Sequence, residues 1–535
     1  TKPFGIKTDY TKMKDAVDNI WDKADVIGIE LGDTSRAEDF RNECTAKMLE
    51  YHRKKAIEEA DRFIGYLLKK ANTDTDLIMI ISPVGPLKEL SNRNRLSPII
   101  AAGRGVQNGW LRSGSTHRDG VVTNMDIGAT ILGFFNLPAL PGQLGNKIHS
   151  IYNSKGLDGL WTFNQKLVSL LSQRHFFIRS YIYIDILIIM TALILLLFRH
   201  KFLDWIKILL LFVMIVPLVY LILPIFYTAS LFKNAVISVA MGIAFTAALI
   251  YFFPNTVDMI FVICMGIVSC LVIDQILGGH LIKDSPLGYD VISGARFYGI
   301  GNEYMGILIG ASCTATAILV EKLHKHKMLG KLSMAAIFSL VFGILVSPDF
   351  GANVGGAISA FFAFLTTYIL ITGRKLTIKR FVAGGCILTC LLLIVFIADS
   401  TKILDTQTHM GQTASLVRQK GIKELLKIFQ RKISMNIKLI KYTVWTKVFL
   451  TSLLAVVILF FRPVGLLKEA VFKYSAIPYG FIGGLVGCIV ALLANDSGIV
   501  AAATMVIYVA PPVILLIIDQ VQNKMRLGEK CYGEG

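Results

Sequence analysis

Residues 207–227 have the sequence KILLLFVMIVPLVYLILPIFY, in which Lys207 is the only charged residue. The hydrocarbon core of a bilayer is about 30 Å thick, so a helix that crosses it needs about 20 predominantly apolar residues. A helix also satisfies its own backbone hydrogen bonds, as lipid requires. The sequence therefore predicts an α-helical transmembrane bundle of about 11 helices over residues 179–519. The apolar runs cover residues 179–198, 207–227, 235–253, 257–278, 303–321, 331–347, 352–373, 381–398, 444–461, 477–494 and 498–518.

The composition agrees with a membrane protein. The chain is 54% hydrophobic, and its net charge of +18 comes from Lys and Arg residues that are dispersed along it. Membrane proteins collect such residues in cytoplasmic loops, so we expect membrane lipids and no nucleic acid as partners. Most of the eight cysteines lie inside apolar runs. They are expected to act as small buried hydrophobes, neither a disulfide framework nor a metal site.

The basic residues also predict an orientation. If the N-terminal region lies outside, five of the six inner segments carry Lys or Arg, and only residues 254–256 are neutral. By the positive-inside rule, we expect a multi-pass protein of a bacterial cytoplasmic membrane. Its N-terminal domain would be extracytoplasmic, and its tail, residues 520–535, cytoplasmic. The inner residues counted include Arg199, Lys201, Lys322, Lys325, Arg374, Lys375, Arg462, Lys468, Lys524 and Arg526.

Residues 1–170 are more polar and show alternating strand and helix patterns. Such alternation predicts an α/β domain, so the expected fold class is mixed: an extracytoplasmic α/β domain followed by a helical bundle. Strands are predicted over 25–31, 77–81 and 98–102, and helices over 43–71 and 124–135.

The order of several short motifs in residues 20–138 resembles the C-terminal half of the alkaline phosphatase superfamily. The motifs are Glu30-Leu-Gly-Asp33 after a strand, a helix with Asp61, a strand that ends at Ile81, Thr116-His117, and Asp126-Ile-Gly-Ala-Thr-Ile-Leu132. The family includes sulfatases, phosphoglycerate mutases and lipoteichoic-acid-type phosphotransferases.

This resemblance implies a site for one or two metals, usually zinc or manganese, with an Asp-His pair after the second matched strand. Ser82-Pro83 stand there in this chain, and proline cannot bind a metal. Asp33 and His117 match two remaining ligands, which are too few for a catalytic ion. The half that carries the nucleophile would precede Thr1. We therefore expect an incomplete, non-catalytic pseudoenzyme domain without a cofactor that binds a partner or polymer.

Four polar segments interrupt the apolar runs at the face predicted to be outer. Residues 288–304 contain Arg296, Asn302 and Glu303, and residues 347–356 contain Asp349 and Asn353. An Arg296–Glu303 ion pair that holds a loop, or a simple capped turn at Asp349, would also account for these residues.

The other two polar segments are the loop 399–443 and the turn 494–498. The loop contains His409 and Arg418 and ends in a basic amphipathic stretch, which is typical of a helix that lies in the headgroup layer. A surface helix that only anchors the chain would look the same. The turn contains Asp496, which a plain polar turn would also explain.

Together these segments predict a polar, partly basic cavity for an anionic substrate. Candidate acids or bases are His409, Asp349 and Glu303. Candidate substrate-binding residues are Arg296, Asn302, Asn353, Arg418 and Asp496. Asp274, inside an apolar run, is expected to pair with Arg296 or Lys283.

Three functions follow from this pattern. The first is an envelope enzyme that transfers or hydrolyses a phospho- or glycosyl group on an anionic lipid-linked or glycopolymer substrate. The second is a transporter or flippase for an anionic lipid or polymer precursor, in which Asp274 would matter most. The third is a non-catalytic scaffold with other envelope proteins as partners.

Overall fold

The protein is described here from a computed structural model. The described residues are 5–85, 87–140, 143, 145–198, 202–290, 292, 294, 296–400, 422–461, 466–471 and 473–526. The chain divides into two compact units. Unit 1 comprises residues 1–111 and 149–164, and unit 2 comprises residues 112–148 and 165–535. The segment 112–148 therefore belongs with the membrane helices, although it precedes them in sequence.

Unit 1 contains short helices and a strand pair. Strands β1 (Leu77–Ile81) and β2 (Ile99–Gly103) are antiparallel, with Met79 opposite Ala101. The strand predicted over 77–81 is confirmed, and the helix predicted over 43–71 is α3 (Ala46–Lys70). The remaining helices of unit 1 are α1 (Tyr10–Ile20), α2 (Asp33–Asp39), η1 (Phe40–Glu43) and α4 (Leu87–Ser91). Strands β3 (Trp110–Ser113) and β4 (Ile148–Ile151) pair with each other, and each includes residues of both units.

The strand predicted over 25–31 is wrong. These residues belong to none of the described strands, and Val26 is exposed. An apolar run becomes a strand only where a neighbouring strand accepts its hydrogen bonds. The described strands form two separate two-stranded sheets. A larger α/β sheet of the alkaline phosphatase type stays a prediction.

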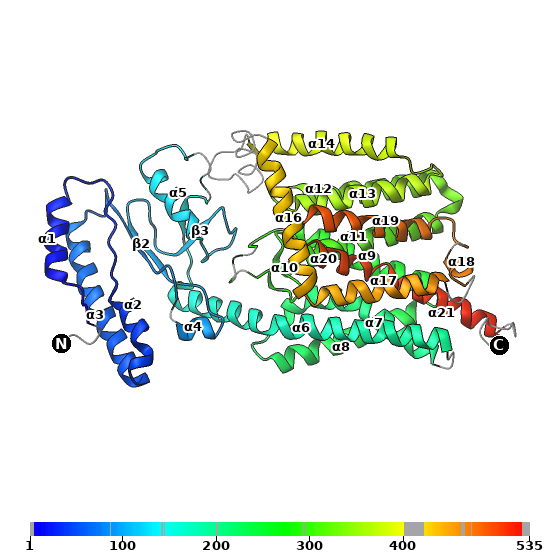
Figure 1. The fold of residues 1–535 in the computed structure, drawn as a ribbon, viewed down its shortest axis with the longest axis horizontal. Helices are drawn as coiled ribbons and strands as arrows, with labels where there is room; N and C mark the ends of the chain where they lie inside the picture. Colours follow the sequence, from blue (N-terminus) through cyan, green and yellow to red (C-terminus); the bar gives the residue numbers. More distant parts are fainter. Residues whose placement is uncertain are drawn as a thin grey trace. The chain divides into compact units, whose positions relative to one another are not determined.

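Unit 2 is a bundle of long apolar helices, which confirms a multi-pass helical membrane protein (Figure 1). Ten of the described helical segments are long and apolar enough to span a bilayer, or 11 if the bent pair α16–α17 counts as one. The spanning segments are α6 (Gly156–Phe198), α7 (Leu203–Ile222) with η2 (Leu223–Phe226), α8 (Leu231–Phe252), α9 (Thr256–Ile276), α11 (Asn302–Lys322), η3 (His324–His326) with α12 (Lys327–Val346), α13 (Val354–Ile371), α14 (Ile378–Ser400), α19 (Ile477–Ala494), and α20 (Gly498–Val506) with α21 (Ala510–Arg526).

Shorter or more polar helices complete the unit: α5 (Met125–Phe134), α10 (His280–Asp284), α16 (Ile422–Tyr442), α17 (Trp445–Phe461) and α18 (Leu466–Val471). α5 confirms the helix predicted over 124–135.

Helix α11 forms the centre of the bundle. Residues 304–318 are all buried, so this helix is enclosed on every side by other helices. It packs against α9, α12, α19 and α20 (Figure 1). Gly306 faces the Ala501 carbonyl so closely that a methyl group would overlap it. The close approach of α11 and α20 therefore depends on glycine.

Three connections meet at one end of this bundle, which we call the polar end. They are residues 277–301 between α9 and α11, 347–353 between α12 and α13, and 495–497 between α19 and α20. The hydrogen bonds described below join the first two connections to each other and the third to α16.

Candidate functional site

The first two connections of the polar end are tied by backbone hydrogen bonds. Ile300 N donates to Gly351 O at 2.8 Å. Asn353 Nδ2 donates to Ile300 O at 2.9 Å, and its Oδ1 accepts from Gly356 N at 2.8 Å, which caps α13. Asn353 is buried, and both the nitrogen and the oxygen of its side-chain amide form hydrogen bonds with the backbone. It acts here as a fastener between loops, not as a free substrate ligand.

Helix α16 fastens the third connection. Asn436 Oδ1 accepts from Gly498 N at 2.7 Å, and its Nδ2 donates to Asn495 O. Lys432 lies 3.7 Å from Asp496, whose side chain is well exposed. α16 meets α17 at an angle of 83°. The amphipathic helix expected in the loop 399–443 is therefore present over 422–442, and it crosses the direction of α17.

Arg296 lies where the loops meet and lacks an acidic partner. Its Nη1 reaches the carbonyl oxygens of Gly351 and Ala352 at 3.5 Å each. No described carboxylate forms an ion pair with it, and the expected Arg296–Glu303 pair is wrong. Burial lowers the pKa of Arg296, although Tyr289, Tyr298 and the carboxylates of Glu303 and Asp496 oppose this shift. A buried guanidinium without a close ion-pair partner attracts an anion.

Glu303 pairs instead with Arg174 of α6, at 2.8 Å. A single sequence does not reveal this pair, because 129 positions separate the two residues. Asn302 is the first residue of α11, beside Glu303. Asp349 is exposed in the turn after α12. His409 and Arg418 lie outside the described residues.

Arg118 is a functional candidate that the sequence analysis missed. It is 6% exposed and donates to Lys283 O at 3.0 Å and to Phe297 O at 3.4 Å. Asp284 lies 3.9 Å away. Burial lowers the pKa of Arg118, against the influence of Tyr289 and Asp284. The segment 112–148 thus places the guanidinium group of Arg118 at the polar end.

The residues matched to metal ligands have other partners. Asp33 in unit 1 forms an ion pair with Arg36 at 2.6 Å. In unit 2, the His117 ring lies 4.2 Å from that of Tyr298, and its φ is +50°. Within the described part of the chain, no three His, Cys, Asp or Glu side chains gather as a metal site would require.

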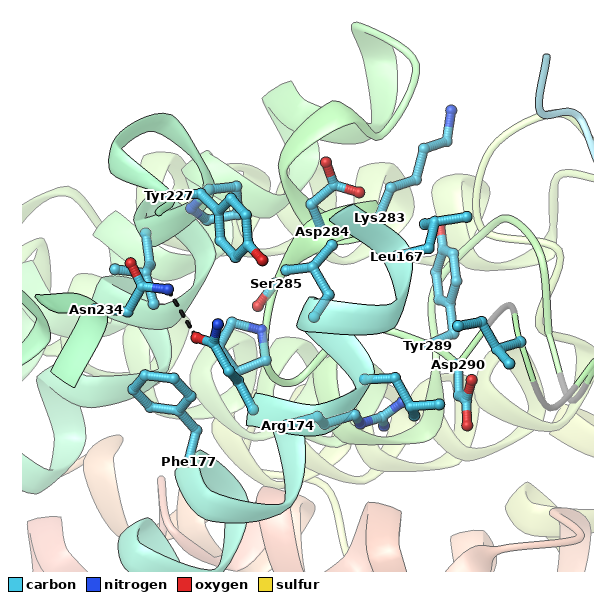
Figure 2. A pocket seen from close by; sticks show the side chains of 17 residues that line it. Leu167, Arg174, Phe177, Tyr227, Asn234, Lys283, Asp284, Ser285, Tyr289 and Asp290 are labelled. Carbon is cyan, nitrogen blue, oxygen red and sulfur yellow. Dashed lines mark hydrogen bonds between the residues drawn. The ribbon is translucent and has the colours of Figure 1, made fainter. Parts of the chain in front are cut away.

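A small pocket with a cavity volume of about 40 Å³ lies beside these cations in unit 2 (Figure 2). One part of its wall is apolar, and the other part carries charged and polar groups. The apolar residues include Leu167, Leu170, Leu171, Phe177, Leu223 and Pro224. The polar residues are Gln173, Arg174, Tyr227, Asn234, Lys283, Asp284, Ser285, Tyr289 and Asp290.

Several polar wall residues are held in place by partners. Asn234 Nδ2 donates to Gln173 Oε1 at 2.7 Å, the bond drawn in Figure 2. Asp284 forms an ion pair with Lys166 at 2.5 Å. Together with the Arg174–Glu303 pair, these contacts fix the wall before any ligand arrives. Such preorganisation lowers the entropic cost of binding.

Two phenols in the wall are unsatisfied. The hydroxyl oxygens of Tyr227 and Tyr289 are buried and form no hydrogen bond of good geometry with a described residue, although Ser169 lies near the first hydroxyl and Arg118 near the second. Figure 2 shows Tyr227 on one side of the pocket and Tyr289 with Asp290 on the other. Burial raises the pKa of both phenols, so both remain neutral donors. A buried donor without an acceptor is costly, and an acceptor on a ligand would remove this cost.

The same end of unit 2 holds groups of both charges. The cations include Arg118, Lys166, Arg174, Lys283, Arg296 and Lys432, and the carboxylates include Asp284, Asp290, Glu303, Asp349 and Asp496. Of the residues named from sequence, the structure brings Arg296 and Asn353 together around Gly351 and places Glu303 at the pocket through Arg174. The pocket residues themselves were missed, because they lie at the ends of apolar runs in four different elements.

Comparisons of this chain with protein-family models, with curated proteins and with solved structures find no match in any of the three. The geometry of the polar end and its pocket is therefore what assigns a chemistry to this membrane protein.

Proposed function

We propose that this chain is a bacterial cell-envelope protein that binds an anionic lipid-linked substrate at the outer face of the cytoplasmic membrane. The observation that carries the proposal is the pocket, which combines an apolar wall with two unsatisfied phenol donors, Tyr227 and Tyr289. Ligand pockets are typically apolar with a few well-placed polar groups that orient the ligand.

The pocket suits an amphiphile with an acidic headgroup. An apolar chain would lie against Leu170, Leu171 and Phe177, next to the spanning part of α6. A phosphate or carboxylate would accept hydrogen bonds from the phenols. Arg174 and Lys283 would add charge attraction, since hydrogen bonds to ionised acceptors are the stronger kind.

The outer location rests on charge distribution. Lys and Arg dominate five of the six segments at the opposite end, as the positive-inside rule requires of a cytoplasmic face. The resemblance of residues 20–138 to the C-terminal half of the alkaline phosphatase superfamily, which includes lipoteichoic-acid-type phosphotransferases, supports the same compartment.

The reaction that we assign to this substrate is transfer or hydrolysis of a phospho- or glycosyl group. Glu303 is the acid or base that we favour, because its carboxylate lies 2.8 Å from the pocket residue Arg174. Asp349 is exposed in a turn, and it is the weaker choice. Envelope proteins that handle the same polymer would be partners.

A transporter is the second candidate. The observation that favours it is Asp185 in the spanning part of α6, whose carboxyl group is buried without a hydrogen-bond partner in the described part of the chain. Acids within membrane helices commonly mark ion or substrate pathways.

Binding of a polyprenyl monophosphate, compared with the matching polyprenyl alcohol, tests the proposal. The purified protein should prefer the phosphate. The double variant Tyr227→Phe/Tyr289→Phe should lose roughly a hundredfold or more in affinity for the phosphate, since each hydrogen bond to a charged group contributes about 1.5–3 kcal/mol. It should keep its thermal stability, because neither hydroxyl has a partner to lose.

Tyr183→Phe provides the matched control, since Tyr183 is exposed and lies outside the pocket. Equal affinity for phosphate and alcohol would reject an anion site. Equal loss in the control and the double variant would reject this pocket as the site and favour the scaffold function.

A further inference from the structure

Asp185 has an unusual environment for a carboxyl group. It lies in the spanning part of α6, has no exposed surface, and neither carboxyl oxygen has a hydrogen-bond partner among the described residues. Its helix neighbours Ile182, Ile188 and Ile189 are buried as well. No hydrogen-bond donor and no cation of the described residues therefore contacts this carboxyl group.

The ionised form is costly in such a place. An isolated carboxylate in an apolar medium is so unfavourable that the group takes up a proton instead. A hard metal cation is a poor alternative, because Ca²⁺ for example needs about six to eight oxygen ligands. The occupant that fits this carboxyl group is therefore a proton.

The nearest titratable neighbour is Tyr181, one turn earlier on the same face of α6. Its hydroxyl donates to Val213 O of α7 at 3.3 Å. That carbonyl is available because Pro217, four residues later, has no N–H to donate to it.

The other titratable groups around Tyr181 are phenols: Tyr220 on α7, Tyr304 on α11 and Tyr508 between α20 and α21. Cys264 of α9 faces Tyr508. No charged side chain of the described residues acts on Asp185. Among the described residues, the groups that can respond to a change in the protonation of Asp185 are therefore neutral hydroxyl groups.

These phenols lead to the pocket. The Tyr220 ring lies 6.0 Å from that of Tyr181 and 5.4 Å from that of Phe177, and its hydroxyl donates to Phe177 O at 3.3 Å. Tyr304 Oη lies 2.6 Å from Ser285 Oγ. Phe177 and Ser285 both line the pocket (Figure 2).

We propose that Asp185 is a proton-binding site in the membrane core and that its protonation is coupled through Tyr181 and Tyr220 to occupancy of the pocket. When the proton leaves for solvent, the new carboxylate draws the Tyr181 hydroxyl away from Val213 O. The ring then moves against Tyr220 and Phe177, which changes the pocket wall. The coupling, but not the proton site, rests on the proposed function.

Infrared spectroscopy tests the proton site without any ligand. The protein in lipid should show the carbonyl stretch of a protonated carboxylic acid at neutral pH, and Asp185→Asn should lack this band. Asp204→Asn, at an exposed acid, should keep it. Absence of the band in the wild type, or its persistence in Asp185→Asn, would overturn the proton site.

Binding of polyprenyl monophosphate at increasing pH tests the coupling. Wild-type affinity should fall about tenfold as Asp185 loses its proton, within the usual range for coupled sites. Asp185→Asn, which mimics the protonated form, should bind as tightly as the wild type does at low pH and should not respond to pH. The same pH response in both proteins would overturn the coupling. A wild type that shows the infrared band but does not bind the phosphate at any pH would reject the proposed function and, with it, the coupling, but would leave the proton site in place.

Discussion

The corner between α9 and α10 and the middle of α6 each bury an aspartate inside an apolar run, and they treat it in opposite ways. Asp274 is 4% exposed, and its oxygens accept from Leu281 N at 2.8 Å and Ile282 N at 3.0 Å. It caps α10 after a reversal at Gly278 and Gly279, both with positive φ. Asp185 has no such donors. Burial alone therefore does not distinguish a structural acid from a functional one. The difference is whether backbone N–H groups donate hydrogen bonds to the carboxylate.

This comparison corrects one expectation from sequence. Asp274 was expected to pair with Arg296 or Lys283, but the N-terminal amides of α10 satisfy it instead. Lys283 Nζ donates to Gly278 O at 2.8 Å. If the protein is a transporter, the sensitive membrane acid is expected to be Asp185.

The largest expected effect is on Asp274. Asp274→Ala removes two hydrogen bonds to a carboxylate and leaves two amides of α10 without an acceptor. The free energy of unfolding should fall by roughly 3–5 kcal/mol. Unfolding in detergent, followed by circular dichroism, measures this loss. Asp204→Ala serves as the control, and an equal stability of both variants would contradict a capping role.

The opposite change is expected at Asp185. Asp185→Leu replaces an unsatisfied carboxyl group with an apolar side chain of similar size. The free energy of unfolding should rise by about 1–3 kcal/mol, the usual cost of a buried polar group without a partner. The same unfolding assay applies. A loss of stability would mean that Asp185 has a partner that supports the fold.

Asn353 extends the comparison to an uncharged side chain, because like Asp274 it is buried and forms hydrogen bonds with the backbone. Asn353→Ala removes the bonds to Ile300 O and from Gly356 N. Because neither partner is charged, the loss should be about 1–2 kcal/mol. Asn302→Ala, at the start of α11, is the matched control. If the two variants unfold alike, Asn353 does not fasten the loops.

The smallest effect concerns a carboxylate near water in unit 1. Burial alone would raise the pKa of Asp33, but hydrogen bonds from Arg36 and Thr8 outweigh it and lower the pKa below its usual value. Stability from this lowering is present above the unfolded pKa of about 3.9 and is lost as the pH falls through the lower folded value.

Acid titration of unit 1 stability checks this prediction. The wild type should lose less than about 1 kcal/mol through Asp33 below pH of about 4, because the ion pair is partly exposed. Asp33→Asn should remove this part of the pH dependence. Retention of the full dependence would assign it to other carboxylates.

Much of the membrane part could be predicted from sequence. Each of the 11 apolar runs corresponds to a described helix, because length and hydropathy alone decide which segments suit a bilayer. Helix α3 and strand β1 follow from local periodicity in the same way. The strand at 25–31 failed because a ladder partner is a tertiary property.

The candidate site was predictable only in part. Glycine and charge near α11 pointed to the polar end, and Arg296 lies there. The Arg174–Glu303 pair and the Arg118 contacts join positions far apart in the chain, so no local pattern encodes them. The sequence around Tyr227 and Tyr289 does not show that the fold buries their hydroxyl groups without a hydrogen-bond partner, so the two phenols could not be predicted as site residues.

Helix α11 also has a consequence for the biosynthesis of the protein. It is enclosed partly by α19 and α20, which the ribosome makes more than 150 residues later. The buried Thr314 hydroxyl of α11 donates a hydrogen bond to Tyr508 O at 2.7 Å, and this acceptor is synthesised after α19 and α20. A nascent chain that has inserted α11 must therefore keep part of the surface of this helix uncovered in the bilayer until α19 and α20 have also been translated. Premature stops before α19 should leave a product that membrane quality control recognises.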